Sequence, residues 1–212
     1  MGGIQEGHVE WAIINRLKAM LDDPPETKFN VTQTFALFSA VLLWTKNRGW
    51  VAGYAQHPQL DNAFDVSAHA FRQQLEQEQI TSLPWALSQQ AYKLIDGHPV
   101  PAGPAVNENF ADMSVATFAK WLRDAIGHGD GRTITPLHKN TGPAHLTWLS
   151  GFRVQFNETL GSQRILDLHL YEPDMRRIGS LLADRFCTAL AQAPGYYEED
   201  VATRVVENEH AA

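Results

Sequence analysis

Apolar residues recur at helical spacing along most of this chain, and the pattern predicts six amphipathic or buried helices. The run from Phe35 to Trp44 is apolar nearly all round, which is typical of a helix in the middle of a bundle. The first three predicted helices run from His8 to Leu21, from Asn30 to around Lys46 to Gly49, and over residues 62–79. The other three run from Ser82 to before Gly97, from Ser114 to Gly127, and from Pro173 to near Pro194.

The pattern changes to a period of two after a polar loop from Gly129 to Thr147. Apolar and polar residues alternate over residues 152–156 and again over 166–170, which predicts a β-hairpin at about 148–171. The expected fold class is therefore mainly α, an antiparallel helical bundle with a small β-hairpin near the C-terminus. Residues 1–193 are expected to form one domain, and residues 194–212 an acidic, flexible tail.

The composition limits the classes of function. The chain has 44% apolar residues, which supports a hydrophobic core, and a single cysteine, Cys187. Its start lacks the pattern of a signal peptide, and the longest apolar run is about half of a membrane span, so we expect a cytoplasmic protein without membrane insertion. The net charge of -7 argues against broad coating of nucleic acid, so any such contact must be local.

Three residues at the end of one predicted helix offer chemistry, namely Arg123, Asp124 and His128. A helix C-terminus favours protonated imidazole, which suits a histidine that both gives and takes a proton near neutral pH. A guanidinium can hold a phosphate through two hydrogen bonds. Gly127 and Gly129 leave room beside His128 for a ligand or a partner backbone.

The segment from Arg123 to His128 resembles the Arg-x4-6-His motif of HEPN proteins, including the polar residue directly after the arginine. In outline the resemblance covers residues 30 to 191 and is similar to a plasmid-borne HEPN branch with a strand pair after the motif helix. It implies a homodimer in which two motifs face each other across one cleft. It further implies a metal-independent endoribonuclease without a cofactor, a toxin or defence effector, in which His128 moves protons and Arg123 supports the scissile phosphate.

RNA supplies its own nucleophile, the 2′-hydroxyl, so two histidines and two arginines from a dimer would suffice for cleavage. Asp124 could orient a histidine or lower the repulsion between arginines. Five Lys/Arg and three Asp/Glu lie between Arg123 and Arg164, a local basic excess that a nucleic-acid cleft requires. The expected RNA contacts in this stretch are Arg132, Lys139 and Arg153. An antitoxin protein would be a further partner, but Asp130 stands where the branch regulated by a nucleotidyltransferase has a tyrosine.

Other interpretations remain open at the level of the sequence. A non-catalytic HEPN module that binds RNA or a nucleotide, or serves in assembly, would keep the same motif. A structural helical domain could also carry Arg123 and His128 by chance. A metal site is not expected, because the histidines at 128, 138, 145 and 169 lack the spacing of a known zinc site. Phosphate-loop and serine-hydrolase motifs are absent from the sequence.

Overall fold

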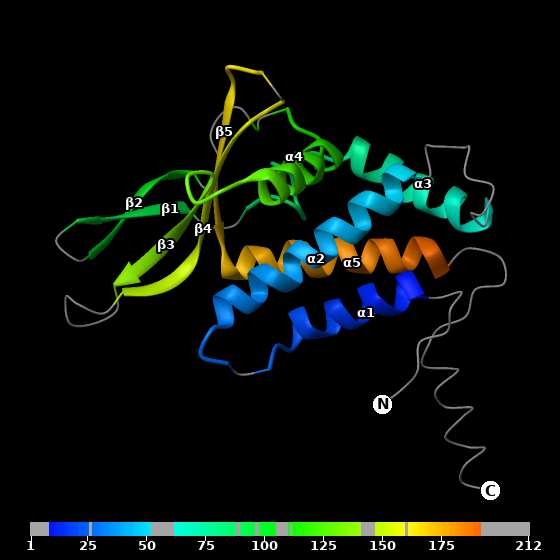
Figure 1. The fold of residues 1–212 in the computed structure, drawn as a ribbon, viewed down its shortest axis with the longest axis horizontal. Coiled ribbons are helices and arrows are strands. Elements are labelled where there is room, and N and C mark those ends of the chain that lie inside the picture. Colours follow the sequence, from blue (N-terminus) through cyan, green and yellow to red (C-terminus); the bar gives the residue numbers. More distant parts are fainter. Residues whose placement is uncertain are drawn as a thin grey trace, which may run out of the picture.

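The computed structural model describes residues 9–25, 27–51, 62–87, 90–95, 98–104, 110, 112–140, 147–159 and 161–191 (Figure 1). Within helices and strands, the side chains at 48–51, 62–66, 90–95, 98–104, 139–140 and 147–148 lie outside the description. The predicted tail at 194–212 lies outside the described residues as well. Among the described segments, no helix combines the length and the apolar character that crossing a membrane would need.

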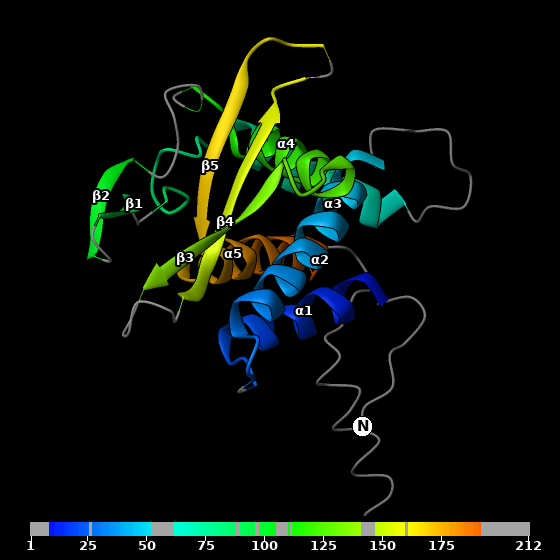
Figure 2. The same ribbon diagram turned by 60° about the vertical axis from the view of Figure 1, so that its left-hand side comes forward.

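The helical layer contains α1 (Val9–Asp22), α2 (Asn30–Val51), α3 (Asn62–Gln77), α4 (Val115–His128) and α5 (Glu172–Ala191). α5 lies at the centre and contacts α1, α2 and α3, because apolar residues recur along its whole length. Gly179 is the point of closest approach, since a Cβ there would lie 2.8 Å from Leu21 Cδ1 of α1. Figures 1 and 2 show the sheet at one side of this layer.

The sheet contains β3 (Ile134–Asn140), β4 (Thr147–Asn157) and β5 (Ile165–Tyr171), antiparallel and in that order. Val154 of β4 pairs with Ile134 of β3 and with Leu168 of β5, so apolar positions line up across the three strands. This face packs on the helices, where the rings of Phe35 and Phe152 lie 4.5 Å apart. The opposite face carries polar residues, as expected for an antiparallel sheet with one buried side.

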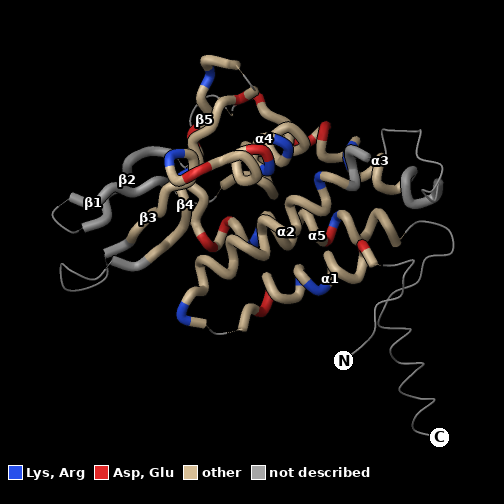
Figure 3. The backbone as a smooth tube through the Cα atoms, viewed as in Figure 1, with Lys and Arg blue, Asp and Glu red and all other residues tan. Residues whose placement is uncertain are grey.

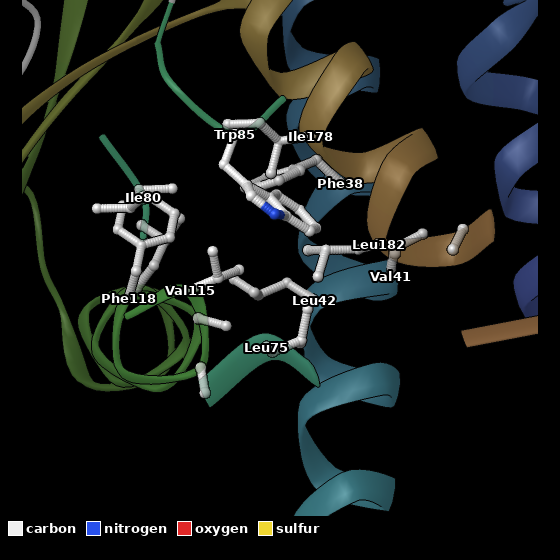
Figure 4. Close-up of a cluster of buried hydrophobic side chains, with 14 of the residues drawn as sticks. Phe38, Val41, Leu42, Leu75, Ile80, Trp85, Val115, Phe118, Ile178 and Leu182 are labelled. Atoms are coloured by element: carbon white, nitrogen blue, oxygen red, sulfur yellow. The ribbon is translucent and has the colours of Figure 1, made fainter. Parts of the chain in front are cut away.

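One hydrophobic core joins both layers. It includes residues of all five helices together with Val154, Leu166, Leu168 and Leu170 of the sheet. Figure 4 shows part of it, in which Val115 and Phe118 of α4 lie beside Ile80, and Trp85 lies beside Ile178 of α5. Because the helices and the sheet share this core, α4 is held from both sides.

The predicted fold class is wrong. The chain forms a mixed α/β fold with a three-stranded antiparallel sheet, not a helical bundle with a small hairpin. The alternating runs do pair as predicted, as β4 and β5. The polar loop, however, contains β3, an edge strand that accommodates Pro136 because one side of such a strand needs no ladder donors.

The helix predicted from Ser82 to before Gly97 is also wrong. Residues 82–87 form turns, and β1 (Gln90–Ile95) pairs with β2 (His98–Pro104) as an antiparallel ribbon. Trp85 is fully buried there, and the Arg177 guanidinium of α5 donates hydrogen bonds to the carbonyls of Pro84 and Ala86. Those tertiary contacts outweigh the local helix signals of Ser82 and Pro84.

Candidate functional site

α4 carries the three motif residues and has a well-defined start and end. The Ser114 hydroxyl accepts a hydrogen bond from the backbone N–H of Thr117, which caps the first turn. The helix ends at His128, where the chain turns away through Gly129. A Cβ at Gly129 would lie 2.2 Å from the carbonyl oxygen of Ala125, so glycine is required at this turn. A Cβ at Gly127 would meet open space.

Arg123 and Asp124 form an ion pair within α4. The Arg123 Nη1 atom lies 3.0 Å from Asp124 Oδ1, and Lys120 Nζ lies 3.2 Å from Asp124 Oδ2. The Arg123 side chain is only 26% exposed, and its buried Nε has no hydrogen-bond partner among the described residues. Asp124 thus bridges two cations, while part of the Arg123 guanidinium stays unsatisfied.

His128 is exposed and lies on a different flank of α4 from Arg123. Five residues rotate a helix by about 500°, which leaves the two side chains about 140° apart around the axis. His128 instead shares its flank with Trp121, seven residues earlier, whose Nε1 donates to the carbonyl of Phe156 in β4. One chain alone therefore does not aim both motif side chains at the same point.

The flank of Arg123 meets further cations from α2 and α3. Lys46 of α2 is 8% exposed, and burial lowers the pKa of its ammonium group. The positive charges of Arg123, Lys120 and Arg72 also lower this pKa, and the negative charge of Asp124 opposes them. Arg72 of α3 pairs with Glu76 on its own helix at 2.7 Å. We call Lys46, Arg72, Lys120 and Arg123 the helix cation cluster; it comes from three helices. Figure 3 shows charged segments of both signs on α4.

Sequence reasoning missed Lys46, Arg72 and Lys120. The sequence indicated Lys46 only as part of the signal that ends the second helix, and it did not single out Arg72 or Lys120 as site residues. Lys120 is one turn from Asp124 on α4, whereas the approach of Lys46 to Arg123 and Arg72 depends on the packing of α2 against α4 and α3. For Lys46, the local signal in the sequence was a lysine directly after the apolar run that ends at Trp44. In the structure this lysine is buried, which is rare for lysine.

Two of the three predicted RNA contacts can be placed in detail. Arg132 is 93% exposed in the turn after α4, and its Nε and Nη2 donate to Asp130 Oδ2 at 2.9 and 2.6 Å. These bonds hold the pKa of Asp130 down to about 2. Lys139 belongs to β3, opposite Trp148 in the register, and its side chain lies outside the described residues.

Arg153 lies on the polar face of the sheet and is held by Asp167. Its Nε and Nη2 donate to the two carboxylate oxygens at 3.0 and 2.6 Å, and Gln155 Nε2 adds a third bond at 3.1 Å. Burial lowers the pKa of neighbouring His169; the charge of Asp167 opposes this, and the charge of Arg153 adds to it. The buried Nδ1 of His169 has no hydrogen-bond partner among the described residues. We call Arg153, Gln155, Asp167 and His169 the sheet cluster.

Neither cluster resembles a metal centre. Within the described part of the chain, no group of three or more histidine, cysteine, aspartate or glutamate side chains could hold a metal ion. Cys187 is buried on α5, and burial raises the pKa of its thiol to about 12, which makes it an inert core residue.

Comparison with known proteins identified no relative of this chain. No model of a known protein family, no curated protein and no solved structure matches this chain significantly. Any assignment of function therefore rests on the residues of this chain: a mixed α/β fold that places a cation-rich helix flank and an exposed histidine at the same end of α4.

Proposed function

We propose that the chain is a metal-independent endoribonuclease of the HEPN type that acts as a homodimer. One observation carries the proposal: α4 presents an exposed His128 at its end and Arg123 within a cluster of four cations. The exposed imidazole suits proton transfer, and the cations suit binding of a phosphodiester. The resemblance to HEPN proteins lies in the short motif and not in a helical bundle.

The reaction needs only groups that two copies of α4 would supply. His128 of one subunit removes the proton from the RNA 2′-hydroxyl, and the 2′-oxygen attacks the adjacent phosphorus. His128 of the second subunit gives a proton to the 5′-oxygen as the P–O5′ bond breaks. Arg123 stabilises the charge on the pentacovalent phosphorus, and the products are a 2′,3′-cyclic phosphate and a free 5′-hydroxyl.

The separation of Arg123 and His128 around α4 is the reason for a dimer in this proposal. A two-fold axis near the end of α4 would bring Arg123 of one subunit toward His128 of the other. Size-exclusion chromatography with light scattering measures the oligomeric state directly. A strict monomer at micromolar concentration would remove the composite site.

The decisive experiment on catalysis compares His128→Ala with the wild type. His128→Ala should abolish RNA cleavage, a loss of at least about a hundredfold for a proton-transfer group, while the circular dichroism spectrum and the dimer survive because the side chain is exposed. Asp124→Asn should reduce cleavage only modestly if Asp124 positions a neighbouring side chain. A His128→Ala protein that fails to fold would assign His128 a structural role instead.

The helix cation cluster also favours a second candidate, because it would bind a phosphate whether or not His128 transfers protons. In that case the chain is a non-catalytic module that binds RNA or a nucleotide. Equal binding of RNA by the wild type and His128→Ala, with no cleavage of a broad RNA panel by either, would favour it over the enzyme.

The biological setting follows from the same proposal. A metal-independent ribonuclease of this type would act in the cytoplasm as a toxin or defence effector, held in check by an antitoxin protein. Of the two predicted RNA contacts whose side chains the structure describes, Arg132 is the more exposed, at 93% against 40% for Arg153.

A further inference from the structure

The outward sides of α1 and α2 carry most of the exposed apolar side chains. Among the described residues, seven large hydrophobic side chains are exposed, and five of them lie on α1, on α2 or directly before α2. Single exposed apolar residues are ordinary, but a patch of them on one side of a protein marks an interaction surface. We call this patch, together with two alanines of α2, the outer helix face; its residues are Val9, Met20, Phe29, Ala36, Ala40, Leu43 and Trp44.

On α2 the residues of the outer helix face follow one line. The Phe29 carbonyl accepts a hydrogen bond from the Gln33 N–H, so Phe29 already follows the helical path. Ala36, Ala40 and Leu43 then recur at helical spacing, over about 21 Å from Phe29. Residues 29–45 contain no charged residue, although 19% of the chain is charged. A helix side that stays in water normally carries charges, so this side of α2 is suited to contact with protein.

The outer helix face approaches the size of a dimer interface. α1 and α2 lie side by side and both pack on α5 (Figure 1). Helices of 14 and 22 residues are about 21 and 33 Å long, and packed helices lie about 9 Å apart, so the two outward sides together cover roughly 500 Å² in projection. A stable dimer buries about 800 Å² on each partner, and α4, which packs beside α2, adds surface at the border.

We propose that a second copy of this chain binds the outer helix face, with α2 of one copy packed on α2 of the other around a two-fold axis. The proposal rests on the proposed function for the need of two copies, and it names the surface that joins them. A chain with a net charge of -7 repels its own copy least where the surface lacks charge. A two-fold contact uses the same patch on both copies, and an apolar patch complements itself. The small side chains of Ala36 and Ala40, between Phe29 and Leu43, let two helices approach closely.

The outer helix face also borders the helix that carries the motif. Because α4 packs beside α2, an interface centred on α2 has α4 at its edge in both copies. A two-fold contact allows several orientations. The composite site needs the one whose axis runs from α2 toward α4, since that orientation sets the two α4 helices against each other.

The test measures the dissociation constant of the dimer by analytical ultracentrifugation over a range of protein concentrations. Ala36→Glu is the main variant, because it sets two like charges against each other in the middle of the interface. Gln74→Glu is the matched control, because Gln74 is also an exposed helical residue and gains the same charge, but lies on α3. Ala36→Lys places the opposite charge at the same position, and circular dichroism checks the fold of each variant.

Ala36→Glu and Ala36→Lys should each raise the dissociation constant of the dimer at least about a hundredfold, because like charges repel strongly in a desolvated interface. Gln74→Glu should change it less than about threefold, as an exposed substitution elsewhere does. An equal mixture of Ala36→Glu and Ala36→Lys should form a heterodimer, because the two side chains then attract across the axis. If the Ala36 variants prove unfolded, Leu43→Gln, at a position 46% exposed, takes their place and should raise the dissociation constant about tenfold.

Three outcomes would overturn the outer helix face as the dimer surface. They are a wild type that stays monomeric at micromolar concentration, a dimer that is equally stable in Ala36→Glu and Gln74→Glu, and a charge-swap mixture that stays monomeric. RNA cleavage decides the proposed function separately. A cleaving dimer that survives Ala36→Glu loses only this surface, and a dimer that Ala36→Glu separates but that cleaves no RNA loses only the enzyme.

Discussion

The helix cation cluster and the sheet cluster both contain an arginine that the sequence singled out, but they differ in charge balance. Arg153 meets both oxygens of Asp167, so its charge is neutralised within the sheet. Arg123 shares Asp124 with Lys120, and its charge acts on Lys46 of α2. Arg153 thus has one carboxylate that receives both donors, whereas the Nε of Arg123 has no hydrogen-bond partner among the described residues.

This difference shows why counting charges along a chain is a weak guide to binding. The basic excess between Arg123 and Arg164 includes Arg153 and Arg132, both of which are engaged by carboxylates close to them. The cations that do accumulate come from α2, α3 and α4, far apart in the sequence. Whether an arginine of a basic stretch can reach a ligand therefore depends on the carboxylates that folding brings to it, as Asp130 and Asp167 show for Arg132 and Arg153.

The largest expected difference is in RNA binding. Arg123→Ala should weaken binding about tenfold to a hundredfold, because a guanidinium that holds a phosphate contributes roughly 1.5 to 3 kcal/mol. Arg153→Gln should change binding less than threefold, because Asp167 already occupies its donors. Fluorescence anisotropy with a common RNA measures both, and circular dichroism checks folding. Equal losses of RNA affinity in the two variants would contradict the difference between the two clusters.

A smaller effect is expected on stability at the sheet cluster. Asp167→Asn should lower the free energy of unfolding by about 1 kcal/mol, a figure reduced for the partial exposure of Arg153. Burial alone would raise the pKa of Asp167, but the hydrogen bonds and charge of Arg153 outweigh it and the pKa falls below 3.8. A carboxyl with a lowered pKa contributes stability above its unfolded pKa, and this contribution is lost as the pH falls through the folded pKa.

The measurement for Asp167 is urea denaturation at several pH values. The wild type should exceed Asp167→Asn in stability at pH 7, and the difference should shrink below pH 4. An unchanged difference at acid pH would mean that the ion pair is not its source. Asn157→Ala, at an exposed position of β4, serves as a control for strand substitution.

The smallest expected effect is a gain in stability at Lys46. Because burial and the charges of Arg123, Lys120 and Arg72 together lower its pKa, the charged lysine is less stable in the folded than in the unfolded chain. Lys46→Met should therefore raise the midpoint of thermal unfolding by a few degrees at pH 7. The gain should diminish as the pH rises toward 10.5, where the wild type can lose the proton. A large loss of stability in Lys46→Met would instead make Lys46 a structural residue.

The parts of the fold that could be predicted are those with a local signal. β4 and β5 alternate in polarity because one face of each is buried, and α4 carries a capping serine before an apolar stripe. β3 could not be recognised, because Pro136 interrupts an edge strand with little buried surface. Residues 82–97 carry helix signals that tertiary contacts of Trp85 and Arg177 override.

The same limit applies to the candidate site. Arg123, Asp124 and His128 lie on one helix, so a short motif could indicate them. Lys46 and Arg72 could not be found in this way, because only the packing of α2 with α3 and α4 brings Lys46 near both Arg72 and Arg123. The pairing of Arg153 with Asp167 depends likewise on the register of β4 and β5.

The central claim is that the end of α4 cleaves RNA without a metal, and the nature of the products tests it most directly. Purified wild-type protein is incubated in EDTA with an RNA and with the same RNA carrying a 2′-deoxy sugar at the cleavage position. The account predicts cleavage of the first, with a 2′,3′-cyclic phosphate end, and none at the deoxy position of the second. Absence of cleavage across a broad RNA panel, or activity that EDTA abolishes and magnesium or zinc restores, would contradict it.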